Sequence, residues 1–124
     1  MSCDVIKFVI SKGADNTFVF TIKQDNSTLP MLIDVSDTFF ADLIALSDDS
    51  IYPQVADKVL TTVGDLANGQ ISLAISETDT ANLVVYKGSE VDRYYLRPTY
   101  KLVLKCTTVA NGDFIAKVPE VYVD

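Results

Sequence analysis

The stretch that decides the fold is residues 94–106, which read YYLRPTYKLVLKC. Its odd positions are mostly charged or polar, whereas nearly all its even positions are apolar or aromatic. Side chains on a β-strand point alternately to opposite faces, so this period of two predicts a strand with one buried and one solvated face. The even positions that we expect in the core are Tyr94, Leu96, Tyr100, Leu102, Leu104 and Cys106.

The chain after this strand carries a hairpin signal. Residues 110–113 read ANGD, and an Asn-Gly pair supplies the positive φ angles of a tight turn. Residues 114–123 are therefore expected to return as the partner strand. Pro119 cannot donate a ladder hydrogen bond, so it should mark a bulge or an edge.

Upstream, short apolar runs alternate with turn residues. Residues 38–46 are apolar at both parities and fit a doubly buried strand or a short helix; the Phe39-Phe40 pair and the neighbouring strands favour a strand. Residues 29–33 should lie at an edge or begin at Pro30. The other expected strands are residues 5–10, 18–22, 55–63 and 70–76, with a turn at 64–69.

The period changes after residue 76. Residues 76–83 read SETDTANL, in which Ser76 can cap free backbone N–H groups while Glu77 and Asp79 favour the positive end of a helical turn. About seven short strands with one helical turn predict an all-β fold, a two-sheet antiparallel sandwich. One domain is expected to cover residues 1–124.

Charge and composition restrict the partners. The chain has 17 acidic and 10 basic residues, a net charge of -7, which disfavours binding to nucleic acid because that requires clustered Lys and Arg. No run approaches the ~20 apolar residues of a membrane span, so no membrane association is expected. The N-terminus has no secretory signal pattern, so the product is expected to stay where it is made. Cys3 and Cys106 are expected to be reduced thiols.

The sequence contains few of the side chains on which enzyme catalysis relies. The chain has no histidine, which removes Ser-His, Cys-His and most zinc arrangements, and it has no glycine-rich phosphate loop. Four aspartates could offer oxygen ligands to calcium but lack the spacing of a calcium loop, so we expect solvated loop carboxylates: Asp34, Asp37, Asp48 and Asp49. We expect a protein that is not an enzyme and binds no cofactor or metal.

The segment 90–98, EVDRYYLRP, holds both arginines of the chain and two of its six tyrosines. Arg and Tyr are enriched in binding hot spots, and a strand would project Arg93, Tyr95 and Arg97 from one face. We predict a protein interface at these three residues. The alternative is that the arginines pair with surface acids such as Asp92 or Glu90.

Three segments carry a resemblance to a known family: residues 13–22, with a glycine before an aromatic strand; residues 32–36; and residues 69–81, a strand that runs into a helical turn. Their order resembles small phage virion proteins with an immunoglobulin-like, baseplate-type domain, such as upper-baseplate proteins. The family usually has a short glycine-tyrosine link after the helical turn, whereas this chain has a longer one at residues 84–95. The resemblance implies an immunoglobulin-like sandwich and a role in virion structure.

These observations lead to a functional hypothesis. The chain is predicted to be a non-enzymatic structural protein of a phage tail, baseplate, neck or head surface, assembled in the host cytoplasm. Its partners would be other virion proteins or further copies of itself. The alternative is a carbohydrate-binding module for host recognition, in which Tyr95 stacks on sugar rings with Tyr86 or Tyr52.

Overall fold

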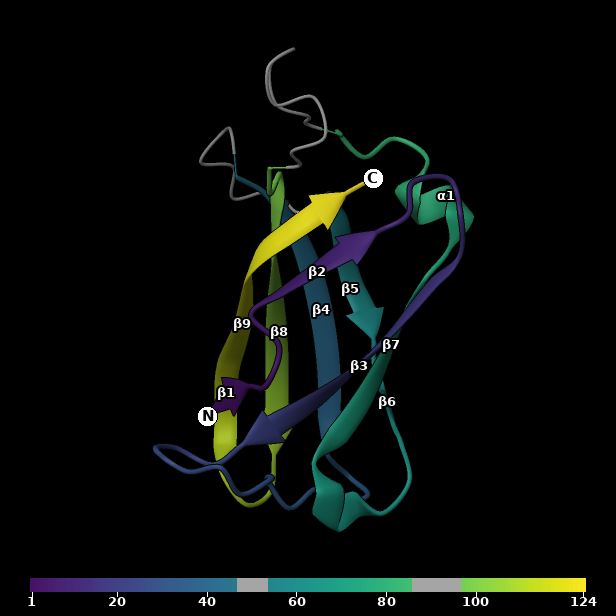
Figure 1. Cartoon of the computed structure of the whole chain (residues 1–124). Helices are drawn as coiled ribbons and strands as arrows, with labels where there is room; N and C mark the ends of the chain where they lie inside the picture. The colour runs from purple at the N-terminus through teal and green to yellow at the C-terminus, as the bar shows by residue number, and fades with distance from the viewer. Residues whose placement is uncertain (47–53, 86–96) are drawn as a thin grey trace.

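The computed structural model describes residues 1–46, 54–85 and 97–124, and β-strands make up most of these ranges (Figure 1). The strands are β1 (Ser2–Cys3), β2 (Lys7–Ile10), β3 (Asn16–Lys23), β4 (Thr38–Ala45), β5 (Val55–Val59), β6 (Thr61–Thr62), β7 (Gln70–Ile75), β8 (Tyr100–Thr108) and β9 (Gly112–Val123). The helical elements are η1 (Leu66–Asn68) and α1 (Glu77–Thr80). None of the helices in the described ranges is long and apolar enough to cross a membrane.

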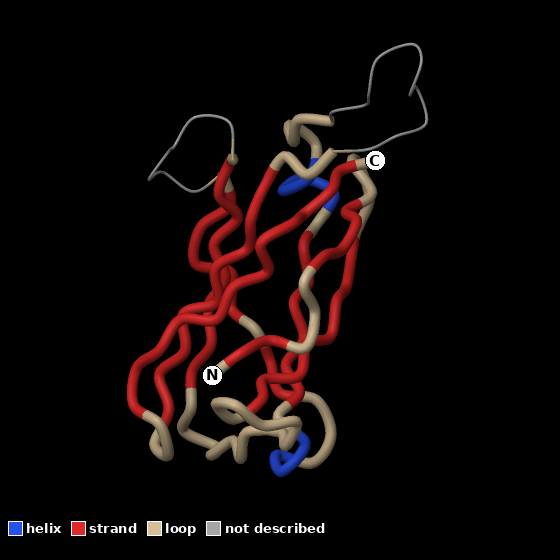
Figure 2. The backbone as a smooth tube through the Cα atoms, turned by 60° about the vertical axis from the view of Figure 1, so that its left-hand side comes forward, coloured by secondary structure: helices blue, strands red, loops and turns tan. Residues whose placement is uncertain are grey.

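The strands form two sheets that pack as a sandwich, with the connections gathered at its two ends (Figures 1 and 2). One sheet has the order β1-β3-β7-β6 and the other the order β2-β9-β8-β4-β5. The first order corresponds to strands A, B, E and D of an immunoglobulin domain, and the second contains the counterparts of G, F, C and C′. The predicted all-β, immunoglobulin-like sandwich is confirmed, although β2 and β9 pair in parallel.

The strand predicted at residues 5–10 is the shorter β2, and a separate strand that was not predicted, β1, precedes it in the other sheet. β1 pairs with β3 in the smaller sheet, whereas β2 pairs with β9 in the larger one. Asp4 holds the crossing point: its N–H donates to the Thr21 carbonyl oxygen over 2.9 Å, and its carboxylate accepts from the Thr21 N–H over 2.8 Å. The first ten residues therefore contact both layers.

The strand that decides the fold is β8, and its inward face is as predicted. Tyr100, Leu102, Leu104 and Cys106 are all buried. The predicted beginning is wrong, because residues 97–99 are not part of the strand, and residues 94–96 lie outside the described ranges. Pro98 explains the boundary, since it has no N–H to continue the ladder.

The last strand, β9, follows the predicted hairpin. Thr108 pairs with Gly112, whose φ of 65° is the left-handed conformation expected at an Asn-Gly turn. Towards the end of β9, Tyr100 pairs with Val121 and Leu102 with Val118. The interval of three residues on β9 therefore faces an interval of two residues on β8. Pro119 lies in this longer interval, which confirms the predicted bulge.

Two of the expected strands are wrong. Residues 29–33 form only an isolated bridge at Pro30, because the chain crosses between elements there: Met31 N–H donates to Ile22 O over 2.7 Å and Ile33 N–H to Leu66 O over 3.0 Å. Residues 55–63 are two strands, since the chain changes sheets at the buried Leu60.

The core lies between the sheets, and one glycine is essential to its closure. Gly69 follows η1 with a φ of 63°, and a Cβ there would lie 2.8 Å from the Ile22 carbonyl oxygen and 2.9 Å from that of Met31. The largest fully buried side chains are Tyr100, Phe20, Phe39, Ile10, Ile22, Met31, Leu43, Ile71, Leu73, Ile75, Leu83 and Leu102.

The predicted helical turn is α1, and Ser76 caps it as expected. The Asp79 N–H donates to Ser76 Oγ and the Ser76 N–H donates to Asp79 Oδ2, each over 3.2 Å, which is a capping box. Buried Thr80 ties the turn to the loop between β2 and β3, because its hydroxyl oxygen accepts a hydrogen bond from Gly13 N–H over 2.9 Å. The residues after α1 thus leave from a fixed position.

Candidate functional site

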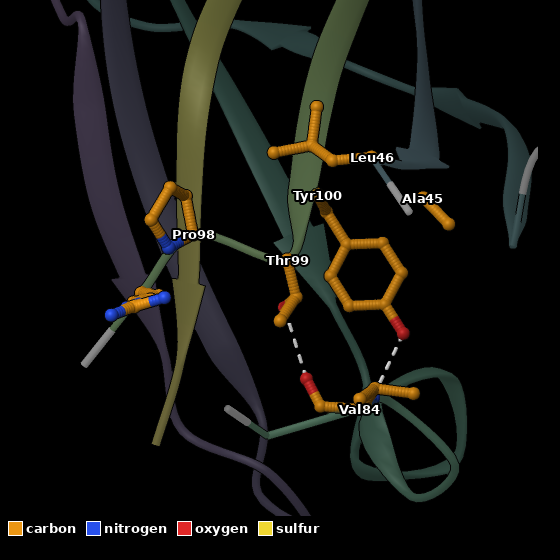
Figure 3. A pocket seen from close by; sticks show the side chains of 7 residues that line it. Ala45, Leu46, Val84, Pro98, Thr99 and Tyr100 are labelled. Carbon is orange, nitrogen blue, oxygen red and sulfur yellow. Dashed lines mark hydrogen bonds between the residues drawn. The ribbon is translucent and has the colours of Figure 1, made fainter. Parts of the chain in front are cut away.

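A pocket of about 350 Å³ lies at the end of the sandwich where the described chain resumes before β8 (Figure 3). Ala45 and Leu46, at and just after the end of β4, form one wall. Val84 forms another, and residues 97–100 form the rest. The predicted interface residue Arg97 therefore lines a concave surface.

Hydrogen bonds fix the walls of this pocket. The Val84 N–H donates to the Tyr100 hydroxyl oxygen over 2.8 Å, and the Thr99 hydroxyl donates to the Val84 carbonyl oxygen over 2.9 Å (Figure 3). On the other side, the Leu46 N–H donates to the Thr99 carbonyl oxygen over 2.9 Å. The segments that contribute Leu46 and Val84 are thus held against the beginning of β8.

Of the three predicted interface residues, the structure describes one. Arg93 and Tyr95 lie outside the described ranges, whereas Arg97 is exposed at the pocket. The sequence prediction put Arg97 on one face with Arg93 and Tyr95 by assuming a strand. Arg97 does not lie on a strand, so that reasoning does not explain its position. Its position follows instead from the neighbouring Pro98 and from the anchored Thr99.

The composition of the pocket limits what it can bind. Its walls are the side chains of alanine, leucine, valine, proline and tyrosine, with the threonine hydroxyl committed to the backbone and one guanidinium beside them. A volume of this size is at the lower end for small-molecule pockets and fits one or two side chains of a partner. The apolar walls suit an apolar side chain of a partner.

The loop carboxylates Asp34 and Asp37 bind backbone groups. Asp34 accepts hydrogen bonds from the N–H and hydroxyl of Ser36, which lower the pKa of its carboxyl group. Asp37 accepts from the N–H groups of Asp34 and Val109, each over 2.9 Å. Asp48 and Asp49 lie outside the described ranges, and the described residues contain no group of three potential metal ligands.

Both cysteines are free thiols in a largely apolar setting. Burial raises the pKa of Cys3 to about 11 and that of Cys106 to about 12. A further cause of the Cys106 shift is the charge of Cys3, whose strand belongs to the other sheet. The thiols are therefore poor nucleophiles.

Comparisons with known proteins add no further candidate. No family model and no curated protein matches the chain. The aromatic platform imagined for carbohydrate binding, Tyr95 with Tyr86 or Tyr52, lies wholly outside the described ranges.

Sequence reasoning missed most of the pocket. Ala45, Leu46 and Val84 carry no signal of a site, because isolated apolar residues at the ends of elements are common. Tyr100 offered the only usable hint: a tyrosine at an inward position needs a partner for its hydroxyl group. That partner, Val84, is 16 residues away in the sequence and could not be chosen in advance.

Proposed function

We propose that the chain is a non-enzymatic structural component of a phage virion, an immunoglobulin-like module that assembles with copies of itself or with other virion proteins. The observation that carries the proposal is the segment 69–81. In the structure it forms β7 and the capped turn α1, the strand-to-turn arrangement on which the family resemblance rests. The sandwich supports it too, since rigid β-modules commonly assemble through surfaces and edges.

The end of the sandwich that carries the pocket is the proposed contact surface for another virion protein. Arg97 and the apolar walls offer a charged group beside a hollow, a combination typical of binding hot spots. Arg93 and Tyr95 belong to the same proposed surface through their place in the sequence. Such a surface would serve equally in a tail, a baseplate, a neck or a head.

The proposal is tested by analysing intact virions. If it is correct, virions banded twice in a density gradient will contain the chain at a fixed number of copies per major capsid protein across all fractions of the band. Quantitative mass spectrometry with isotope-labelled peptides of the chain measures this ratio. A phage replication protein serves as the control for adhering cell contents.

Two results would contradict a structural role. One is absence of the chain from purified virions. The other is a copy number that varies across the gradient in step with the replication protein. Enzyme activity or glycan binding in the absence of virion incorporation would place the chain in a different class of protein.

A further inference from the structure

The edge of β9 has an unpaired run. β2 pairs only with Glu120–Val123 of β9, and no other described strand pairs with β9 on the side away from β8. β1 lies beside β9, but its ladder is formed with β3 in the other sheet. Residues 112–118, between the hairpin turn and Pro119, therefore present a regular strand edge of about 20 Å.

The side chains of this run have a symmetric pattern. Asp113, Ile115 and Lys117 are exposed on the outer face of the sheet, whereas Ala116 and Val118 point into the core. Ile115, at the centre of the run, is 57% exposed. Asp113 and Lys117 lie at equal distances on either side of it, and neither forms an ion pair with another described residue.

An antiparallel copy of the same run matches this pattern. If two β9 strands pair about a two-fold axis through Ile115, Asp113 of each chain faces Lys117 of the other, and the two Ile115 side chains face each other. Opposite charges and apolar side chains directly across an antiparallel pair stabilise it, because their Cβ atoms lie about 5 Å apart. The full run of seven residues, 112–118, is centred on the same axis.

The other sheet edges are less suited to such pairing. β1 and β6 have only two residues each. β3 is paired with β1 only at Ile22 and Lys23, but the rest of that edge, residues 16–21, has no charged side chains that could complement a second copy. β5 carries a register shift, and its Asp57 has a φ of 51° and donates its N–H to the Asp42 carboxylate over 2.8 Å. Bulges and occupied backbone groups of this kind block the addition of a strand.

We infer that a second copy of this chain binds at residues 112–118 of β9, giving a two-fold symmetric dimer in which the two five-stranded sheets become one continuous sheet. The occupant is a second copy because, in an antiparallel pair of two such runs, each negative charge faces a positive charge of the other chain. This inference deepens the proposed function, on which it rests for its biological context, by naming one partner and its contact.

The test measures self-association of the purified full chain by sedimentation velocity, from about 10 μM to about 1 mM at low salt. The wild-type chain is expected to form dimers. In the dimer of Asp113→Lys, two pairs of lysines face each other across the interface, and in the dimer of Lys117→Asp two pairs of aspartates do. Each single variant should therefore raise the dissociation constant about tenfold.

Charge reversal provides the decisive controls. The double variant D113K/K117D restores both pairs and should dimerise as the wild type does. An equimolar mixture of the two single variants should form a heterodimer, because its lysines then face aspartates at both positions. Lys101→Asp, the same charge change on the outer face of β8 away from the edge, should leave the dissociation constant unchanged.

The inference is overturned by a wild-type chain that stays monomeric over the whole range, or by single variants that associate no more weakly than Lys101→Asp. It is also overturned if the mixture of single variants fails to associate. Circular dichroism checks that all variants are folded. Since no virion is used, failure here leaves virion incorporation untouched, and absence from virions leaves this dimer untouched.

Discussion

Gly69 shows how strongly a single residue can constrain this fold. Its positive φ allows the chain to turn from η1 into β7 while two carbonyl oxygens approach within 3 Å of where a Cβ would lie. Its own carbonyl oxygen accepts a hydrogen bond from Ile22 N–H over 2.9 Å. Conformation and space therefore both demand glycine at this position.

Gly69→Ala is expected to lower the free energy of unfolding by about 3 kcal/mol, because it combines backbone strain with a clash against backbone atoms that cannot move aside. Gly64→Ala is the matched control: its φ is 64°, but nothing lies within 4 Å of the position that a methyl group would take, so a loss of about 1 kcal/mol is expected. Urea denaturation measures both. Equal losses of stability in the two variants would show that the close contact at residue 69 does not contribute to the cost of the substitution.

The two thiols make stability depend on alkaline pH. Their pKa values are raised to about 11 and about 12 from 9.0, so the unfolded chain loses its thiol protons first as the pH rises. The stabilising contribution of the neutral thiols is therefore complete below about pH 9 and is lost progressively up to about pH 12. Denaturation at pH 8, 9 and 10 should show this decline.

Lysines and tyrosines also titrate in this pH range. The double variant Cys3→Ala/Cys106→Ala therefore isolates the contribution of the thiols to the pH dependence of stability. Its stability at pH 8 will be lower because side-chain volume is lost, but its decline with pH should be shallower than that of the wild type. Parallel pH profiles would show that the thiols ionise as easily in the folded state as in the unfolded chain.

Among the elements, α1 depends on its cap more than on its length. A helix of four residues has few internal hydrogen bonds, and the capping box supplies two more. Lys58 reinforces the cap from β5, with its Nζ 2.5 Å from Asp79 Oδ2, and this contact lowers the pKa of the Asp79 carboxyl group.

Replacing the capping hydroxyl should therefore loosen α1. Ser76→Ala is expected to cost about 1 kcal/mol of stability, whereas Ser76→Thr, which keeps an oxygen acceptor, should cost much less. Hydrogen exchange at the Asp79 and Thr80 amides reports the local effect. Unchanged exchange in the alanine variant would mean that the other contacts of the turn, those of Thr80 and Lys58 among them, hold it without the cap.

Elements with a clear period could be predicted from the sequence. The inward face of β8, the turn before β9, the bulge at Pro119 and the cap at Ser76 each follow from local rules that the tertiary structure does not oppose. The uncertain segment 38–46 is the strand β4, as its aromatic pair suggested.

The strands that were predicted wrongly share a different cause. A strand that changes sheets keeps its apolar pattern, so residues 55–63 give no sign of the switch at Leu60. The two-residue strand β1 is too short to give a period of its own. Residues 29–33 are buried in part without being in a sheet, and burial alone produces the same apolar run. The pocket at Arg97 depends on contacts between distant segments, which no local pattern encodes.

For the whole molecule, the two arginines provide a test of the proposed contact surface. If both residues serve an interface, Arg93→Ala/Arg97→Ala is expected to reduce incorporation of the chain into virions but to change stability by less than about 0.5 kcal/mol. Lys12→Ala/Lys23→Ala removes the same charge elsewhere and should leave incorporation unchanged. Loss of folding in the arginine variant would assign these residues a structural role instead.

The parallel pairing of β2 with β9 determines how the domain responds to tension. Four successive residue pairs, from Lys7 with Glu120 to Ile10 with Val123, connect strands that point the same way. A force that pulls the beginning of β2 and the end of β9 apart loads these pairs together in shear, whereas an antiparallel arrangement would let them open one after another. The four β2–β9 pairs are therefore expected to resist such a force together rather than in sequence.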